Sequence, residues 1–334
     1  MSMTPREAPR AANARACEIA LGVLLMAALP AAQATCQYKQ LGAIPATWVD
    51  HRLEIDGSVD LAPLKMTIDT GTAWTSVSSA VVARLNLRVA PTVTTESTPA
   101  GEKSGTTAKL KELSLGRFQW IEPWVVVGWQ GVGAPDVMVG ANVLLEHDVE
   151  LDGRRIAFFA PTGCEDAALA YWAEDVPWVP TAVVAPRDLR TIVSVQVNGQ
   201  PVRALVDSGS PATILDSAVA RRLGAEPEDA GTQPAVAGSR VKRVSVARVD
   251  AIAIGPEIVR HARLQVGDLR PGGLGDVPAT KSDRQAPEVP EMILGADFVQ
   301  SHHLLFATSQ HRLYFSYLGG EVFSVPPRTA VAAH

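Results

Sequence analysis

Two stretches of the chain, MTIDTGTAWTSVS at residues 66–78 and ALVDSGSPATILD at residues 204–216, follow one pattern. Each has an apolar run, then Asp, a small hydroxyl residue, Gly and a second small hydroxyl residue. The aspartates, Asp69 and Asp207, are 138 positions apart. A single Asp-[Ser/Thr]-Gly is an ordinary turn sequence. Because the pattern occurs twice after similar apolar runs, it indicates an internal duplication.

The similarity between the two halves extends well beyond these stretches. Three further pairs of segments match: SSAVVARL (78–85) with DSAVARRL (216–223), LSLG (113–116) with IAIG (252–255), and VMVGANVLLEH (137–147) with MILGADFVQSH (292–302). The repeat covers most of residues 51–159 and 191–316. That length is too great for a solenoid unit, so the sequence predicts a duplicated domain.

Each half predicts a mainly β fold with short helices. Alternating apolar residues, as in IVSVQV at 192–197, are typical of strands, and Asn198-Gly199 is favoured in hairpin turns. After each Asp motif the sequence predicts a short helix, with Ser78 or Asp216 as its N-cap. A second short helix is expected further on in each half, after the glycine of the later matching segment.

The first 34 residues have the pattern of an export signal. Three arginines precede an uncharged, mostly apolar stretch from Ile19 to Ala32, and Ala32-Gln33-Ala34 fits a small-x-small cleavage site. The alternative is an uncleaved membrane anchor, although the apolar run is short for a span and Pro30 interrupts its end. We therefore expect an exported protein, periplasmic or secreted, whose mature chain has no membrane span.

Two cysteines, Cys36 and Cys164, remain after such a signal. An exported protein meets an oxidising compartment, so these residues are a candidate disulfide, with two free thiols as the alternative. Lipidation of Cys36 is not expected, because Gln33 stands where a lipoprotein signal has Leu.

The repeat also sets the expected domain boundaries. They are a signal peptide (1–34), a first lobe (35–165), a linker (166–190), a second lobe (191–320) and a C-terminal tail (321–334). The linker contains three prolines and matches nothing in the other half. Residues 268–290 form a Gly-, Pro- and charge-rich insertion, interpreted as a surface loop, with a lid over a site as the alternative.

Two aspartates supplied by a duplicated domain can form an acid–base pair. Two carboxylates within hydrogen-bond distance cannot both ionise easily, so they share one proton. The ionised member takes a proton from a water that attacks a carbonyl, and the protonated member donates to the carbonyl oxygen. No cofactor and no metal is required.

The residues beside each Asp suit such an acid–base pair. Gly71 and Gly209 lack a Cβ, which lets the two loops approach closely. The remaining hydroxyl residues have two expected roles: Thr70 and Ser208 hydrogen-bond across to the opposite loop, while Thr72 and Ser210 donate to the carboxylates.

The repeated motifs resemble those of a known protein family. D-T-G-T at 69–72 and D-S-G-S at 207–210 resemble the catalytic loops of aspartic proteases, and MVGANVL (138–144) and ILGADFV (293–299) resemble that family's second signature. The closest likeness is to bacterial retropepsin-like proteins of the pepsin–retropepsin clan, here as a tandem pair.

The resemblance implies two homologous acid-protease-type β-barrel lobes, related by a pseudo-twofold axis, with an active cleft between them. It also implies aspartic endopeptidase activity, with Asp69 and Asp207 as the dyad. Gly140 and Gly295 would pack beneath the active loops.

A flap is expected after the first helix of each lobe. The candidates are STPAGEKSG (97–105) and AVAGSRVK (235–242), with tips near Ala100-Gly101 and Ala237-Gly238. Neither segment has the Tyr of a pepsin-type flap, so both fit a retropepsin-like flap better.

A second class of function stays open, a non-catalytic exported module that binds peptides or proteins and descends from such a protease. Both aspartates and their flanking hydroxyl residues are present, which favours the enzyme. The expected partner is a peptide or protein substrate. A net charge of −5 without a long basic run argues against nucleic acid. The oligomeric state is not readable from the sequence.

Two other features have ordinary interpretations. His302-His303 has no third ligand at a useful spacing, so a surface or helix-end role is favoured over a metal site. Trp120, Trp124 and Trp129 could line a ligand groove, but ordinary packing is the favoured interpretation.

Overall fold

The computed structural model describes residues 36–98, 101–128, 135–185, 188–228, 232–235, 241, 243–269 and 290–323. Several features of the sequence therefore lie outside the described residues. They are the signal-like segment, the flap-tip residues Ala100, Ala237 and Gly238, Trp129, most of the insertion at 268–290, and the tail beyond residue 323.

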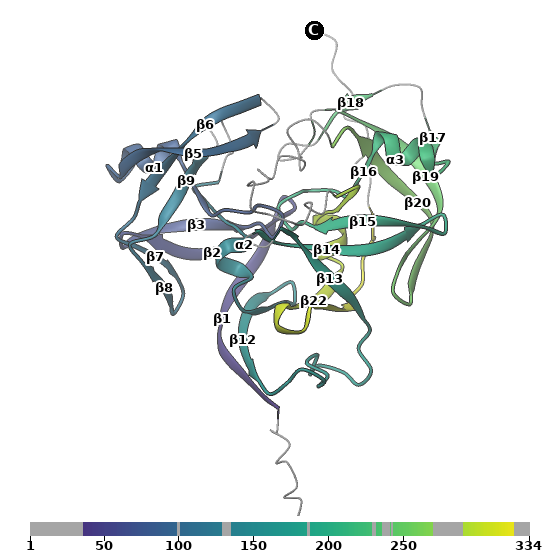
Figure 1. The fold of residues 1–334 in the computed structure, drawn as a ribbon, viewed down its shortest axis with the longest axis horizontal. Coiled ribbons are helices and arrows are strands. Elements are labelled where there is room, and N and C mark those ends of the chain that lie inside the picture. Colours follow the sequence, from purple (N-terminus) through teal and green to yellow (C-terminus); the bar gives the residue numbers. More distant parts are fainter. Residues whose placement is uncertain are drawn as a thin grey trace, which may run out of the picture. The chain divides into compact units, whose positions relative to one another are not determined.

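Strands dominate the described chain (Figure 1). In the first half they are β1 (Gln37–Val49), β2 (Arg52–Val59), β3 (Ala62–Ile68), β4 (Ser76–Ser78), β5 (Arg88–Thr98), β6 (Gly101–Lys109), β7 (Glu112–Leu115), β8 (Phe118–Ile121), β9 (Trp124–Gly128), β10 (Val137–Val139), β11 (Asp148–Leu151) and β12 (Arg155–Thr162). In the second half they are β13 (Trp178–Ala185), β14 (Asp188–Val197), β15 (Gln200–Val206), β16 (Ile214–Asp216), β17 (Glu226–Pro227), β18 (Gln233–Pro234), β19 (Arg243–Ile254), β20 (Glu257–Gly267), β21 (Met292–Leu294), β22 (His302–Ala307) and β23 (Arg312–Tyr317). The predicted mainly β fold is confirmed.

The helices are short and lie where the sequence predicts them. They are α1 (Ser79–Arg84), α2 (Ala141–Leu144), α3 (Ser217–Arg222), α4 (Ala296–Val299) and a 3₁₀ turn, η1 (Thr308–Gln310). The side chain of Ser78 accepts a hydrogen bond from the backbone of α1, and Asp216 does the same for α3, so both predicted N-caps are confirmed. Within the described residues, no helix is long and apolar enough to cross a membrane.

The two halves share one strand topology. In the first, β3 runs antiparallel to β2 and parallel to β10, and β4 lies between β10 and β9. In the second, β15 runs antiparallel to β14 and parallel to β21, and β16 lies between β21 and β20. The corresponding pairs have the same direction throughout. The two lobes expected from the repeat are therefore present and are built to one plan.

A further sheet joins the two lobes through backbone hydrogen bonds. Its strands follow the order β1, β12, β11, β22, β23 and β13, and the pair β11–β22 connects one lobe to the other. Strand β13 occupies the place in the second lobe that β1 occupies in the first. Part of the segment expected as a linker, residues 166–190, is thus a strand of this lobe. Pro180 is tolerated there because β13 lies at the end of the sheet.

The apolar core explains how the strands before the Asp motifs are held. The last three residues of β3 and of β15 are buried, and so are all residues of β10 and β21 beside them. Each large aliphatic side chain buried in this way contributes about 1.5–3 kcal/mol. The segments that lead into Asp69 and Asp207 are therefore anchored in the core, as their sequences predict.

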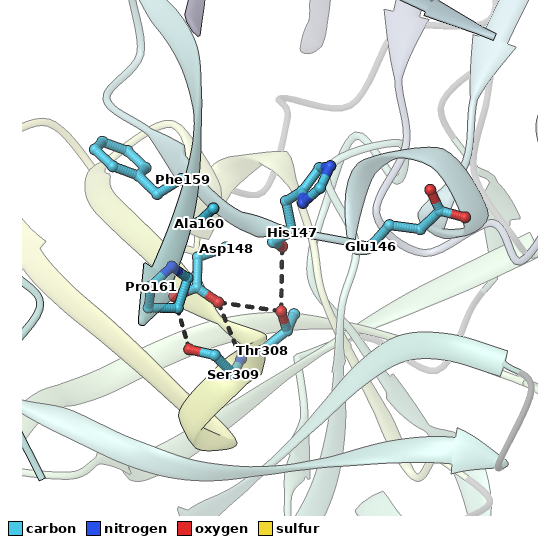
Figure 2. A pocket seen from close by; sticks show the side chains of 8 residues that line it. All are labelled: Glu146, His147, Asp148, Phe159, Ala160, Pro161, Thr308 and Ser309. Carbon is cyan, nitrogen blue, oxygen red and sulfur yellow. Dashed lines mark hydrogen bonds between the residues drawn. The ribbon is translucent and has the colours of Figure 1, made fainter. Parts of the chain in front are cut away.

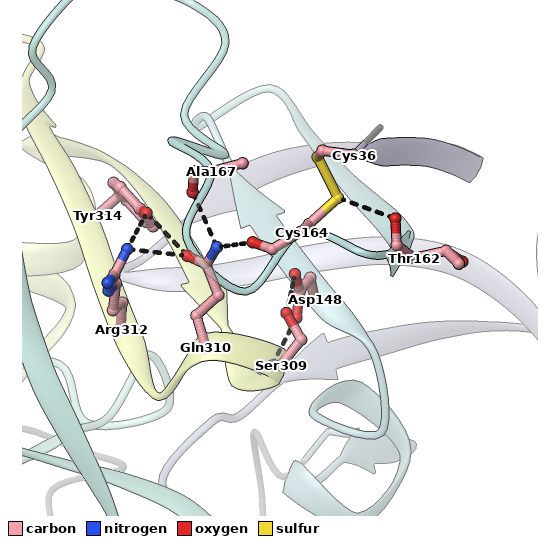
Figure 3. Close-up of a disulfide and its surroundings, with 9 residues drawn as sticks. All are labelled: Cys36, Asp148, Thr162, Cys164, Ala167, Ser309, Gln310, Arg312 and Tyr314. Atoms are coloured by element: carbon pink, nitrogen blue, oxygen red, sulfur yellow. Dashed lines mark hydrogen bonds between the residues drawn. A yellow bond between two sulfur atoms is a disulfide. The ribbon is translucent and has the colours of Figure 1, made fainter. Parts of the chain in front are cut away.

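A disulfide closes the outer end of the first lobe's part of this sheet. Cys36 precedes β1 and Cys164 follows β12, and the two sulfurs are bonded across a sequence separation of 128 residues (Figure 3). The amide of Gln310, from the second half, donates to the backbone carbonyls of Cys164 and Ala167. The first lobe's sheet edge is thus held both covalently and by the other lobe.

Candidate active site

Two loops carry the repeated Asp motifs, and each is fixed by the strand beside it. The backbone N–H of Asp69 donates to the carbonyl of Val139 over 3.0 Å, and that of Asp207 donates to Leu294 over 2.9 Å. Both carboxylates are almost completely buried, with 1% of Asp69 and none of Asp207 exposed. The neighbouring strands therefore position the two aspartates in the same way.

Four hydrogen bonds lock the two loops together. The hydroxyl of Thr70 accepts from the N–H of Ser208 (3.1 Å) and donates to the carbonyl of Val206 (2.8 Å). The hydroxyl of Ser208 accepts from the N–H of Thr70 (3.1 Å) and donates to the carbonyl of Ile68 (2.9 Å). Each hydroxyl thus uses both its donor and its acceptor on the opposite loop, which is the cross-loop role expected from the sequence.

The glycines of the two motifs bring the carboxylates together. A Cβ atom on Gly71 would overlap the carboxyl group of Asp207, and one on Gly209 would overlap the carboxyl group of Asp69. The N–H of Gly71 also donates to Asp69 over 3.0 Å, so this single glycine contacts both carboxylates. Only a residue without a side chain permits this arrangement, which places the two carboxylates next to each other.

The outer hydroxyl residues of the motifs behave differently in the two lobes. Thr72 donates to Oδ2 of Asp69 over 2.9 Å, as expected. The hydroxyl of Ser210 instead donates to the carbonyl of Ala212 (3.0 Å). Oδ1 of Asp207 accepts hydrogen bonds from the backbone N–H groups of Gly209 (3.0 Å) and Ser210 (3.1 Å). Ser210 therefore supports its carboxylate through the backbone and not through the predicted side-chain bond.

A second layer of contacts holds each loop from below. A Cβ on Gly140 would lie 2.9 Å from the carbonyl oxygen of Thr72, and one on Gly295 would overlap the backbone of Ala212. The two glycines thus pack directly beneath the loops, as the resemblance implies. Their N–H groups donate to the hydroxyls of Thr75 (3.0 Å) and Thr213 (3.1 Å).

Sequence reasoning missed the polar side chains that complete this layer. Asn142 accepts from the N–H and the hydroxyl of Thr75 through one amide oxygen (2.7 and 3.0 Å). Asp297 accepts the same two bonds from Thr213, one on each carboxylate oxygen (3.0 and 2.7 Å). The aligned segments that follow Gly140 and Gly295 contain this pair, and comparing them position by position would have found it.

Burial sets Asp297 apart from Asn142. Desolvation raises the pKa of Asp297 to about 6, against the hydrogen bonds from Thr213 and Phe298 and the charge of His51, which favour ionisation. The second lobe therefore carries a titratable group at a position where the first lobe has a neutral amide.

The described parts of the flap candidates lie on hairpins. Gly101 begins β6 and pairs with Thr98 at the end of β5, so the first candidate lies at the turn of the β5–β6 hairpin. The second candidate follows β18, and its tip lies outside the described residues.

The histidines noted in the sequence have structural partners. His302 is buried at the start of β22, three residues beyond α4, where one ring nitrogen lies 2.7 Å from the carbonyl of Phe298 and the other 3.0 Å from Glu257. His303 contacts Glu150 over 3.1 Å and stacks on Trp172. His302 therefore contacts the helix through the carbonyl of Phe298 but belongs to a strand, and its full burial differs from the expected surface or helix-end role.

A hollow of about 300 Å³ lies on the joining sheet (Figure 2). It is formed by β11, β12, η1 and the residues before β11, and neither motif loop contributes to it. Within it, Asp148 accepts from the N–H and the hydroxyl of Ser309, each over 2.9 Å. These contacts link the two lobes and account for the buried carboxylate.

Comparison with known proteins gives three findings. A family model described as "Aspartyl protease" matches residues 52–143 and 193–298, one region in each lobe and together more than half of the chain. No curated protein sequence matches. Among solved structures, the chain is similar to an aspartic proteinase from Irpex lacteus, with a TM-score of 0.49 and 14% identity, over 84% of this chain and 97% of that one.

Proposed function

Because the chain belongs to the aspartyl protease family, we propose that it is an endopeptidase in which Asp69 and Asp207 activate a water molecule. The observation that carries the proposal is the reciprocal contact between each carboxylate and the glycine of the opposite loop. The four cross-loop hydrogen bonds of Thr70 and Ser208 support it, because they hold the two carboxylates in a fixed relation.

The proposed reaction needs one proton shared by the pair. The ionised carboxylate removes a proton from the water as it attacks the peptide carbonyl, and the protonated carboxylic acid donates its proton to the carbonyl oxygen. The tetrahedral diol then loses a hydroxyl proton to one carboxylate, while the other protonates the leaving nitrogen and the C–N bond breaks. The proton balance closes, and the pair regains its single proton.

We further propose that the protein acts after export. The bonded Cys36 and Cys164 support this, since disulfides persist in oxidising compartments. Fractionation of cells and N-terminal sequencing of the recovered protein test the proposal. A mature chain that begins at Thr35 is expected, whereas a full-length cytoplasmic chain with two free thiols would contradict it.

The function is tested by incubating the protein with a diverse peptide pool over a range of pH and reading the products by mass spectrometry. Asp69→Asn and Asp207→Asn should each lower cleavage at least 100-fold, because removing an acid–base group costs about 10²–10⁴-fold. Asp56→Asn is the matched control, since the Asp56 side chain is 83% exposed and forms a surface ion pair with Lys65, whereas Asp69 and Asp207 are buried.

Thermal unfolding of all the variants shows whether the fold persists. Near-wild-type cleavage by either dyad variant would refute the assignment. A folded wild-type protein that cuts no peptide at any pH would favour the alternative, a module that binds peptides without hydrolysing them.

A further inference from the structure

The stretch between β12 and β13, residues 163–177, passes from the first lobe to the second without regular secondary structure. Connections longer than about 12–15 residues without helix or strand are uncommon in compact domains and ordinarily have a role of their own. Parts of this stretch are nevertheless buried, since Leu169 is 1% exposed and Ala170 is 6% exposed. Residues 163–177 are called the connector below.

The connector covers a small apolar core that is separate from the main core. The buried members of this small core come from the connector and the second lobe: Cys164, Leu169, Ala170, Leu305, Ala307 and Tyr314. Tyr38, near the start of β1, packs against the same cluster. Small clusters beneath a long loop bury few contacts and open more readily than the main core of a domain. The small core therefore depends on whatever holds the connector in place.

Two adjacent aromatic residues tie the later part of the connector to opposite lobes. The hydroxyl of Tyr171 donates to Glu150 on β11 over 2.6 Å. The indole N–H of Trp172 donates to Ser316 on β23 over 3.0 Å, and its ring stacks on His303 of β22 with 3.8 Å between the ring centres. Strands β11 and β22 are the pair that joins the lobes. The connector is thus held on both sides of the junction.

The disulfide holds the start of the connector. It bonds Cys36 to Cys164, and the backbone carbonyl of Cys164 accepts from the side-chain amide of Gln310 in η1 (Figure 3). Next to Gln310, the N–H and the hydroxyl of Ser309 both donate to Asp148 of the first lobe over 2.9 Å. A chain of contacts therefore leads from the disulfide, through η1, to a buried carboxylate at the junction of the lobes.

The strand that carries Cys36 lies at the end of the joining sheet. Residues Gln37–Pro45 of β1 pair with β12, and this pairing and the disulfide hold the start of the strand. Without the covalent bond, the first residues of β1 separate from the sheet more easily. Tyr38 then no longer covers the small core, which exposes the connector's apolar residues to water.

The two bonded cysteines differ in access. Cys36 is exposed, whereas Cys164 is 3% exposed within the small core. Because thiol–disulfide exchange requires access to a sulfur, an external thiolate reaches the bond more easily at Cys36. The attack forms a mixed disulfide with Cys36, and the Cys164 thiolate leaves and takes a proton. The second thiolate of a dithiol then attacks its own mixed sulfur, which releases Cys36 as a thiol and the reductant as a disulfide. Two electrons and two protons pass to the protein.

We propose that the connector is a redox-sensitive strap, which holds the two lobes together while Cys36 and Cys164 are bonded and loosens their junction when a dithiol reduces the bond. The main cores of both lobes stay folded in the reduced form. The inference concerns the junction of the lobes and does not depend on peptide cleavage.

Hydrogen exchange of the folded protein, with and without dithiothreitol, tests the strap. After reduction, amides of the connector, β11 and β22 should exchange about tenfold faster, which corresponds to the loss of one or two hydrogen bonds. Amides of the β19–β20 hairpin, inside the second lobe, are the internal reference and should not change. The double variant Cys36→Ser, Cys164→Ser should match the reduced wild-type protein and ignore dithiothreitol. Gln310→Ala should speed exchange in the connector even with the disulfide formed.

Reaction with a monothiol tests the predicted point of attack. Incubation with reduced glutathione, followed by acid quenching and mass spectrometry of peptides, should find the mixed disulfide on Cys36 and not on Cys164. A mixed disulfide mainly on Cys164 would contradict the exchange as proposed.

Three results of the exchange experiment would overturn the strap. Faster exchange confined to the start of β1 would mean that the disulfide only fastens an end strand. Loss of protection throughout both lobes would mean that it is needed for the fold itself. A bond that dithiothreitol leaves intact, as shown by alkylation of free thiols, would mean that the folded protein has no such switch.

Discussion

The two lobes are nearly identical where they hold the backbone of the Asp loops and different where they surround it. Thr70 and Ser208 make the same pair of bonds in opposite directions, and Gly140 and Gly295 pack alike beneath the loops. The outer positions diverge. The strand pairs Ser76–Val126 and Ile214–Gln265 set Trp124 of the first lobe against Arg263 of the second, and the repeat sets Trp74 against Ala212. The symmetric part is what the proposed chemistry needs, and the positions that differ are not required for it.

The largest expected effect comes from breaking the symmetric contact. In Gly71→Ala or Gly209→Ala the new methyl group overlaps the opposite carboxylate, so the pair must separate and proton sharing is lost. Peptide cleavage should fall at least 100-fold in each variant, the lower end of what acid–base catalysis contributes.

Gly199→Ala is the control for this prediction. Gly199 has a φ of +74° in a hairpin turn and no atom within 4 Å of an added Cβ, so the change tests backbone strain alone. It should cost about 1–2 kcal/mol of unfolding free energy and leave cleavage unchanged. Equal activity of Gly71→Ala and Gly199→Ala would show that the carboxylates need not be adjacent.

The disulfide marks a second difference between the lobes. The first lobe closes its end of the joining sheet with the disulfide Cys36–Cys164. The second lobe contains no cysteine. Its Arg312 stacks on Trp178 instead, with 4.1 Å between the guanidinium carbon and the centre of the ring. Cys36→Ser with Cys164→Ser should lower the unfolding free energy by roughly 2–5 kcal/mol, because a long loop of the unfolded chain is released. Arg312→Ala should cost only about 0.5–2 kcal/mol.

Chemical denaturation with and without reductant checks this comparison. The reductant should destabilise the wild-type protein and the Arg312→Ala variant by the same amount. A double serine variant as stable as the oxidised wild-type protein would mean that the first lobe does not depend on its covalent closure.

The cross-loop lock should be equally sensitive from either side. Ser208→Ala leaves the buried N–H of Thr70 and the carbonyl of Ile68 without this partner, and Thr70→Ala does the same to Ser208 and Val206. At about 1–3 kcal/mol for each of the two unsatisfied groups, each variant should lose about 2–6 kcal/mol. Thr70→Ser and Ser208→Thr keep the hydroxyl and serve as controls. Unequal losses measured by denaturation would show that the lock is not symmetric.

The repeated motifs made much of this arrangement predictable. A sequence motif that occurs in both halves implies the same strands in both halves. A close approach of two loops requires small residues, and the motifs supply them at Gly71, Gly209, Thr70 and Ser208. The hydroxyl direction of Ser210 was not predictable, because a serine hydroxyl rotates freely enough to reach the nearby carbonyl of Ala212.

The remaining features depend on contacts between residues far apart in the sequence, which local sequence patterns do not predict. Strand β13 contains Pro180 and pairs with β23, more than 120 residues later in the chain, so local periodicity does not reveal it. Trp74 and Trp124 line one small hollow, which sequence order does not reveal because it depends on the pairing of β4 with β9. The role of Asp297 was not predicted because an acidic residue in a short helix is ordinarily exposed, whereas Asp297 is only 6% exposed.

Asp297 offers the finest test of the difference between the lobes. Burial raises the pKa of this carboxyl from 3.8 to about 6, so the folded protein holds its proton more tightly than the unfolded chain does. Its contribution to stability is therefore complete below pH 4 and disappears as the pH rises through 6. A difference of about 2 between the folded and unfolded pKa values corresponds to roughly 3 kcal/mol.

In Asp297→Asn the second lobe acquires the amide that the first lobe has at Asn142. The difference in unfolding free energy between the wild-type protein and this variant should change by up to roughly 3 kcal/mol between pH 4 and pH 7, in favour of the variant at the higher pH. Asn142→Asp should introduce a dependence of the same sign but smaller size, because Asn142 is only partly buried. Denaturation at several pH values measures both. A constant difference between wild-type protein and Asp297→Asn across this range would mean that Asp297 titrates as it does in water, and that the lobes differ here in sequence but not in electrostatics.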